Sequence, residues 1–259
     1  IGKICYHHCI IRHFQFRKCL PVYSNKILLV TQSFMIERLY FMIEKLKRYS
    51  HIWILSYAFI YLPWFSYLEK TVTRDYYVIH TALDDLIPFS EYFIVPYLLW
   101  FVYVAGTILF FFFKNKQTYY RLCIYLFTGM TLSLVICTIF PNGTDLRTVV
   151  DPGKNVFCWM ISVLHKADTN TNIFPSIHVF NSLVVHITIC KSDELGKLRL
   201  VKIASLVLCV SICLSTMVLK QHSIVDVMGA ALMAYGLYPL AYGTLPSPQR
   251  RKVKAWGNS

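Results

Sequence analysis

The chain has 259 residues, of which 56% are hydrophobic and 16% aromatic, and its mean hydropathy is +0.49. This apolar content exceeds that of ordinary soluble globular domains, so it indicates an integral membrane protein. The formal charge of +13 suggests a nucleic-acid partner, but no nucleic-acid-binding motif accompanies it. We therefore expect the bilayer to be the partner and expect no nucleic acid.

Six apolar stretches have the length needed to cross ~30 Å of hydrocarbon at ~1.5 Å per residue. In chain order they are 51–68, 92–113, 121–140, 175–190, 200–219 and 224–243. We expect an all-α polytopic protein with one six-span membrane domain at 51–246, flanked by basic cytosolic segments at 1–50 and 247–259. Because residue 1 is not Met, we expect residues 1–34 to be translated upstream sequence, with Met35 or Met42 as the start.

The basic residues predict how the chain is oriented. Twenty of the 26 Lys and Arg residues fall in the N-terminal segment, the C-terminal tail and alternate connections, and six fall in the remaining connections. This asymmetry follows the positive-inside rule and places both termini in the cytosol. The two long connections, 69–91 and 141–174, then lie on the outer side, most simply of the cell membrane. We expect the functional site there, because loops carry most functional residues.

Cysteines and tail histidines give no sign of a disulfide framework or a metal site. Most of the nine cysteines fall in predicted spans or in the N-terminal segment, where apolar packing or a reduced state is expected. The stretch "CYHHC" at 5–9 has no second pair at zinc-finger spacing. We therefore expect no metal and no cofactor.

Ionisable residues from separate segments meet at one predicted interface. His178 follows Pro175 near the start of the fourth span, and Pro suits the first turn of a helix. His222 and Asp226 are four residues apart, so on a helix they share one face. Each residue alone has a structural interpretation, such as an interfacial side chain or an interhelical hydrogen bond.

Two cations extend this group. Arg147 follows the third span, and Lys220 ends the fifth. Either could instead be an anchor near lipid headgroups. We expect His51 and His186 to be structural, because His186 lies deeper in its span and His51 at the cytosolic edge. The arrival of the whole group on one side favours a catalytic site.

Two motifs resemble those of the type 2 phosphatidic acid phosphatase superfamily. "PSIH" at 175–178 is similar to the second signature P-S-x-H, and "STMVLKQHSIVD" at 215–226 to the third, S-R-x5-H-x3-D. The resemblance covers roughly residues 51–243. It implies a six-helix fold that agrees with the span count.

Two departures concern the cations of that family. The first signature, K-x6-R-P, is absent, because Phe140 stands at the lysine position and Thr148 replaces the proline after Arg147. Thr216 replaces the arginine of the third signature, and Lys220 is a candidate to compensate. The pattern is more similar to the branch that includes inositol phosphorylceramide synthases, in which the first signature is weak.

The resemblance implies a metal-independent mechanism. His222 attacks phosphorus and forms a phosphohistidine, Asp226 orients its imidazole, and His178 protonates the leaving alkoxide. The residues expected to hold the phosphate are Arg147, Lys220, Ser176 and Ser215. The substrate is then a lipid phosphate or diphosphate.

Several alternatives remain open at this level. The same first half-reaction serves a phosphatase or a phosphotransferase that uses an alcohol acceptor. A six-span transporter and a metalloenzyme with His178, His222 and Asp226 as ligands are the other classes. Gly229 and Gly236 are expected to be helix-packing residues rather than a hinge. The sequence leaves the particular lipid and the oligomeric state undetermined.

Overall fold

The computed structural model describes residues 36–42, 44, 47 and 49–243. The chain divides into two compact units, residues 1–53 and 54–259. In the first unit, residues 36–42 are helical. The predictions made for residues 1–34, for the "CYHHC" stretch and for the tail at 247–259 lie outside the described residues.

Helices occupy all six predicted apolar stretches of the chain. The first stretch is divided between a 3-10 helix, η1 (Ser50–Tyr57), which crosses the boundary of the units, and α2 (Ala58–Thr71). The other five form α4 (Ile94–Lys114), α5 (Lys116–Ile139), α7 (Ile177–Lys191), α8 (Arg199–Val218) and α9 (Ile224–Tyr242). The prediction of an all-α class is confirmed.

Four of these segments are long and apolar enough to cross a bilayer. They are Glu91–Lys114, Lys116–Ile139, Arg199–Val218 and Ile224–Tyr242. The α7 helix has 15 residues and is about 22 Å long at ~1.5 Å per residue, which is shorter than the ~30 Å hydrocarbon core. The α2 helix has 14 residues, with Pro63 inside it.

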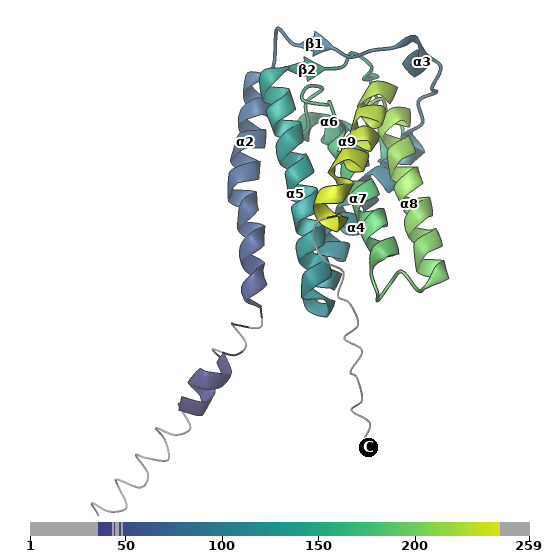
Figure 1. Cartoon of the computed structure of the whole chain (residues 1–259). Coiled ribbons are helices and arrows are strands. Elements are labelled where there is room, and N and C mark those ends of the chain that lie inside the picture. Colours follow the sequence, from purple (N-terminus) through teal and green to yellow (C-terminus); the bar gives the residue numbers. More distant parts are fainter. Residues whose placement is uncertain (1–35, 43, 45–46, 48, 244–259) are drawn as a thin grey trace, which may run out of the picture. The chain divides into compact units, whose positions relative to one another are not determined.

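The core of the second unit is built around α7. This helix packs against α4, α5, α8 and α9 (Figure 1), and its side chains Phe180, Val184 and Val185 are fully buried. Gly129 of α5 lets the Phe180 ring approach closely, because a Cβ atom at residue 129 would lie 2.0 Å from that ring. A helix surrounded in this way has apolar residues on every face, which is the pattern of the α7 sequence.

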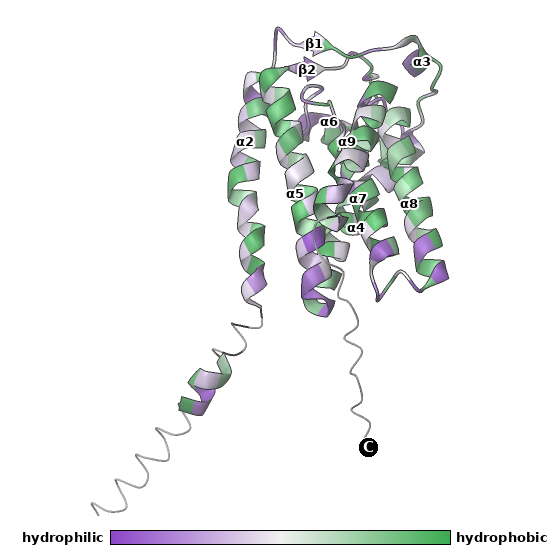
Figure 2. Ribbon diagram, in the orientation of Figure 1, coloured by the Kyte–Doolittle hydropathy of each residue, from purple (hydrophilic) through white to green (hydrophobic). Residues whose placement is uncertain are grey.

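Apolar side chains cover the outward faces of the peripheral helices. Examples are Phe113 on α4, Leu200 and Val207 on α8, and Leu232 and Tyr235 on α9, all of which are exposed. Figure 2 shows hydrophilic residues at the ends of α5, α7 and α8 that lie away from the strands. Large exposed apolar surfaces mark contact with a membrane or another protein, and this distribution is compatible with an integral membrane protein.

Two short strands join the long connections of the chain at one end of the helices (Figure 1). Strand β1 (Tyr77–Val78) pairs in parallel with β2 (Asn142–Gly143), and Gly143 also bridges to Thr171. The buried Asn142 side chain accepts hydrogen bonds from the backbone N–H groups of Ile173 and Phe174 at 3.0 and 2.9 Å. These contacts hold the segment before α7 against the end of α5.

Three further short helices belong to the long connections. They are α3 (Ala82–Asp85), η2 (Glu91–Phe93) and α6 (Val156–Ala167). The connection at 141–174 was expected to be a loop, so α6 is an addition to the sequence prediction. The Asn155 side chain caps α6 by accepting a hydrogen bond from the backbone N–H of Cys158 at 2.9 Å, as expected for an N-cap residue.

Candidate functional site

The His222 and Asp226 side chains meet at the N-terminus of α9. His222 Nδ1 lies 3.3 Å from Asp226 Oδ2, and Asp226 is fully buried. The pair is not formed on one helical face as the sequence suggested, because α9 begins at Ile224 and His222 precedes it. The meeting depends instead on a capping box, in which Asp226 Oδ2 also accepts the backbone N–H of Ser223 at 2.8 Å.

Asp84, which sequence reasoning did not select, fixes this helix N-terminus. Its Oδ1 atom accepts the backbone N–H of Ile224 at 2.8 Å, and its Oδ2 atom accepts the Ser223 hydroxyl at 2.7 Å. Burial raises the pKa of Asp84, but the hydrogen bonds from Ile224, Ser223 and Thr81 outweigh burial, so the net shift of the pKa is downward. Asp84 therefore carries its negative charge at the positive end of the α9 dipole.

His178 lies across from His222 and is the second residue of α7. Its ring stacks on Tyr97 with a centroid distance of 4.5 Å and contacts Trp100 at 4.4 Å. The centroids of the His178 and His222 rings are 5.9 Å apart. The structure thus brings together two histidines that are far apart in the sequence, and the two α4 aromatic rings fix the orientation of one of them.

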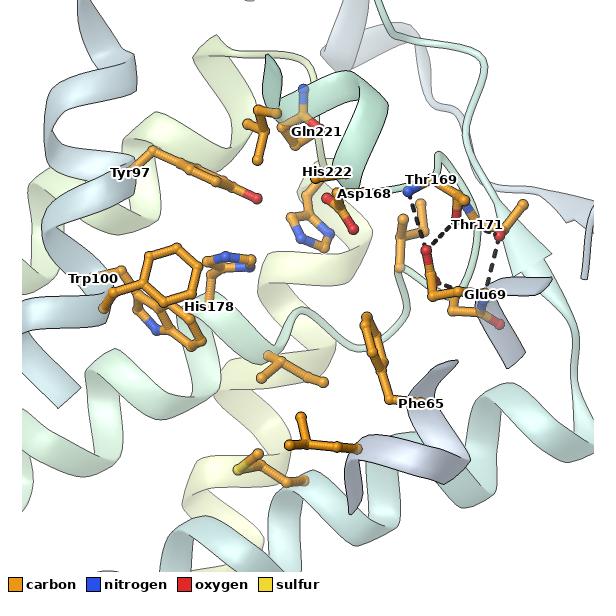
Figure 3. A pocket seen from close by; sticks show the side chains of 18 of the residues that line it. Phe65, Glu69, Tyr97, Trp100, Asp168, Thr169, Thr171, His178, Gln221 and His222 are labelled. Carbon is orange, nitrogen blue, oxygen red and sulfur yellow. Dashed lines mark hydrogen bonds between the residues drawn. The ribbon is translucent and has the colours of Figure 1, made fainter. Parts of the chain in front are cut away.

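A cavity of about 390 Å³ lies between these residues, and both histidines line it. Figure 3 shows Tyr97 and Trp100 on one side and Glu69 and Thr169 on the other, with His178, His222 and Asp168 between them. The cavity also has apolar walls from three helices, made by Tyr61, Leu62, Phe65, Phe101 and Met130. Leu62 and Phe101 are at the same time exposed, so these two side chains belong both to the cavity wall and to the outer surface of the helices.

Arg147 lines the cavity, but its guanidinium is already hydrogen-bonded. Its Nη1 atom donates to the carbonyl of Asp168 at 2.7 Å, and its Nη2 atom donates to the carbonyl of Thr169 at 2.6 Å and to Asp168 Oδ2 at 3.4 Å. Burial lowers the pKa of Arg147, and the Asp168 charge opposes that shift. Burial likewise raises the pKa of Asp168, opposed by Arg147. These contacts tie the start of the connection between β2 and α7 to a segment near its end.

The other three predicted phosphate ligands do not line the cavity. Lys220 is buried in a left-handed backbone conformation with φ 58°, and its Nζ donates to the carbonyl of Asp84 at 2.5 Å. Ser176 is the N-cap of α7, and its hydroxyl accepts the backbone N–H of Val179. The Ser215 hydroxyl donates to the carbonyl of Ile212 at 2.7 Å. All three act within the backbone framework in this structure.

Sequence reasoning missed several polar residues of the cavity lining, among them Glu69, Asp168 and Gln221. Glu69 offered a weak signal, because it is a lone acid at the end of an apolar stretch. Asp168 and Gln221 gave no comparable signal, since each stands in a polar connection. Within the described part of the chain, no three His, Cys, Asp or Glu side chains gather closely enough to hold a metal ion.

Comparison of the chain with protein-family models, with curated proteins and with solved structures finds no match. The argument for function therefore rests on the residues and their geometry.

Proposed function

We propose that the protein is an integral membrane enzyme that cleaves a phosphorus–oxygen bond of a lipid through a phosphohistidine. The observation that carries this proposal is the His222–Asp226 pair facing His178 across a cavity with apolar walls. The two sequence signatures that resemble those of the type 2 phosphatidic acid phosphatases supply these same three residues. The first candidate is a phosphatase acting on a lipid phosphate or diphosphate.

The first half-reaction uses each of the three side chains once. Asp226 accepts the Nδ1–H of His222, which leaves the Nε2 lone pair free to attack phosphorus. As the nitrogen–phosphorus bond forms, the phosphorus–oxygen bond to the leaving group breaks. The N–H of a protonated His178 transfers its proton to the departing alkoxide, so that an alcohol leaves.

The second half-reaction returns the enzyme to its starting state. His178, now neutral, accepts a proton from water or from an acceptor hydroxyl as its oxygen attacks phosphorus. The bond from phosphorus to His222 breaks, and phosphate or a new phosphoester is released. Asp226 stabilises the imidazolium that His222 passes through in both halves, as a carboxylate partner does for other catalytic histidines.

A phosphotransferase that passes a phospho-headgroup to an alcohol is the second candidate, and a specific observation favours it. The Arg147 guanidinium is engaged by Asp168 and Thr169, and the Lys220 ammonium donates to Asp84 outside the cavity lining. Arg147 keeps one unpaired donor, its buried Nε–H, so the two cations together offer little compensation to a dianionic phosphomonoester. A phosphodiester with one negative charge requires less cationic compensation, so it suits this site better.

We place the domain in the membrane with six spans, α2 and α7 being the two short ones. The long connections meet at one end of the helices, where the two histidines also lie. The basic residues at 114–121 and 191–202, around the α4–α5 and α7–α8 connections, favour the cytosol for the opposite end. The site then faces the outer side of the cell membrane. A headgroup at this level keeps its acyl chains in hydrocarbon. A transporter is less well supported, because its ionisable residues would gather near the midplane.

Phosphate release from lipid phosphates and diphosphates by the purified protein in EDTA tests this proposal. His222→Ala should abolish release, whereas His186→Gln, a change at a half-buried α7 histidine that contacts Ser205 and does not line the cavity, should retain it. A lipid alcohol added as acceptor separates transfer from hydrolysis. Equal turnover in wild type and His222→Ala, or loss of turnover in EDTA, would rule out the phosphohistidine scheme.

A further inference from the structure

Glu69 places a negative charge on the cavity wall without a direct ion-pair partner among the described residues. Its Oε1 atom accepts the Asn172 amide at 2.9 Å, and its Oε2 atom accepts the Thr169 N–H at 3.1 Å and the Thr169 hydroxyl at 2.5 Å. All three donors are neutral. Among the described residues, no Lys, Arg or His lies within ion-pair distance of Glu69. The carboxylate is therefore held in place by neutral donors, and Arg147 acts on it without direct contact.

Without the two histidines, the charged side chains of the cavity lining carry a net negative charge. Apart from the histidines, the ionisable acids and bases that line it are Glu69, Asp168 and Arg147. Asp168 and Arg147 neutralise each other through their ion pair, which leaves one negative charge. A second anionic group beside Glu69 would be repelled by this carboxylate, whereas a group with a positive charge would be attracted to it.

Gln221 lines the same cavity and contains a second, unpaired acceptor. Its side chain is buried, with 2% of the residue exposed, and its Nε2 atom donates to the Leu219 carbonyl at 3.2 Å and to His165 Nε2 at 2.9 Å. Burial first, and then Arg147, lower the pKa of His165, so its neutral ring can accept this bond. The Gln221 Oε1 atom has no partner among the described residues. A buried unpaired acceptor costs about 1–3 kcal/mol, so a small rotation of this amide toward a cationic or N–H-bearing ligand would be favourable.

Aromatic rings complete the environment of Glu69. Tyr61, Phe65 and Glu69 are spaced four residues apart on α2 and line the cavity together. The Tyr61 and Phe65 rings are stacked, with centroids 6.0 Å apart and an interplanar angle of 8°. Figure 3 shows Phe65 and Glu69 on the side of the cavity away from Trp100. Aromatic faces beside a carboxylate are a recurrent setting for ammonium groups.

We infer that the substrate is a zwitterionic phosphodiester lipid whose headgroup ends in an ammonium group, with the phosphate between His178 and His222 and the ammonium at Glu69. This inference rests on the proposed function and narrows its substrate class. His222 displaces the diacylglycerol oxygen, which leaves as an alcohol with the proton from His178, and the phospho-headgroup stays on His222. An acceptor hydroxyl then gives its proton to His178 and takes the headgroup. Glu69 holds the ammonium through both steps.

Turnover of paired lipids by the same enzyme tests the inference. The panel contains phosphatidylethanolamine and phosphatidylcholine as ammonium lipids, and phosphatidic acid and phosphatidylglycerol as anionic lipids, in otherwise identical mixed micelles. Wild type should prefer the ammonium lipids in kcat/KM. Glu69→Gln should lower the ratio of ammonium to anionic turnover by about tenfold or more. The ratio is independent of the fraction of folded enzyme, because both substrates report on the same molecules.

The matched control is Asp145→Asn, which removes one negative charge from an exposed side chain that pairs with His80 and does not line the cavity. This variant should leave the ratio unchanged. Preference of wild type for phosphatidic acid or phosphatidylglycerol, or an unchanged ratio in Glu69→Gln, would overturn the ammonium assignment while leaving the phosphohistidine chemistry intact.

A binding measurement keeps the two proposals separable. Native mass spectrometry of His222→Ala should show retained phosphatidylethanolamine over phosphatidylglycerol, and the double variant with Glu69→Gln should lose that preference. If wild type turns over none of the four lipids and none of the lipid phosphates, the proposed function fails. The retention of phosphatidylethanolamine over phosphatidylglycerol still tests whether Glu69 binds an ammonium group. Equal retention of both lipids by His222→Ala would overturn the inference.

Discussion

Replacing Asp84 with Ala should remove the support of the α9 N-terminus without touching the cavity lining. The carboxylate accepts hydrogen bonds from the Ile224 N–H, the Ser223 hydroxyl, and the Thr81 N–H and hydroxyl, at 2.7–2.9 Å. Hydrogen bonds to a charged group contribute about 1.5–3 kcal/mol each, and a buried donor left unpaired costs about 1–3 kcal/mol. Because the four bonds share one side chain, they do not add fully, and we expect a loss of about 3–4 kcal/mol.

Thermal unfolding in detergent and lipid turnover measure the two consequences. The midpoint temperature of thermal unfolding should be about 6–16 °C lower in Asp84→Ala than in wild type, at about 2–4 °C per kcal/mol for a domain of this size. Turnover below the midpoint should also fall, because His222 is held next to this helix start. Asp85→Ala is the matched control, since the adjacent Asp85 is largely exposed and bonds only to His80 among the described residues. Equal midpoints for Asp84→Ala and Asp85→Ala would refute the reasoning.

Three further outcomes follow from other contacts. Asp226→Asn should lower kcat by about 10²–10⁴-fold through a misoriented His222 ring, and rates matching wild type would contradict the pair's role. Gly129→Ala should destabilise the fold measurably in thermal unfolding, because its Cβ would meet the buried Phe180 ring at 2.0 Å; an unchanged midpoint would show that the ring moves away freely. His80 lies between two carboxylates, and its hydrogen bond to one of them leads the causes that raise its pKa. The stability it contributes is full below its unfolded pKa of about 6.5 and disappears as pH rises through the raised value, so the midpoint difference between wild type and His80→Ala should shrink from pH 5 to pH 9.

Much of the fold was predictable because hydrophobic runs are a local property of the chain. The boundaries of α4, α8 and α9 differ from the predicted stretches by a few residues, since a span must end where apolar residues end. Boundaries that depend on capping were harder. The α5 helix begins at Lys116, five residues before the predicted 121. Its N-cap is Asn115, whose side chain accepts hydrogen bonds from the backbone N–H groups of Gln117 and Thr118.

The interpretation of the two glycines in α9 was only partly predictable. A Cβ on Gly229 would lie 2.5 Å from the Phe174 ring, so this glycine permits close packing of the segment before α7. Gly236 has nothing within 4 Å of its Cβ position, and the structure gives no reason for it. The difference depends on which face of α9 meets Phe174, and sequence spacing does not specify that face.

By itself, the sequence determined the apolar helices, the segregation of basic residues and the motif residues His178, His222 and Asp226, because each is a matter of residue type and spacing. Only the tertiary structure decided which partners the charged side chains contact. It turned Lys220 toward Asp84, paired Arg147 with Asp168 and brought Glu69 to the wall of the cavity. A side chain's partner depends on segments far away in the chain, so its electrostatic role is settled only when the helices and connections have packed.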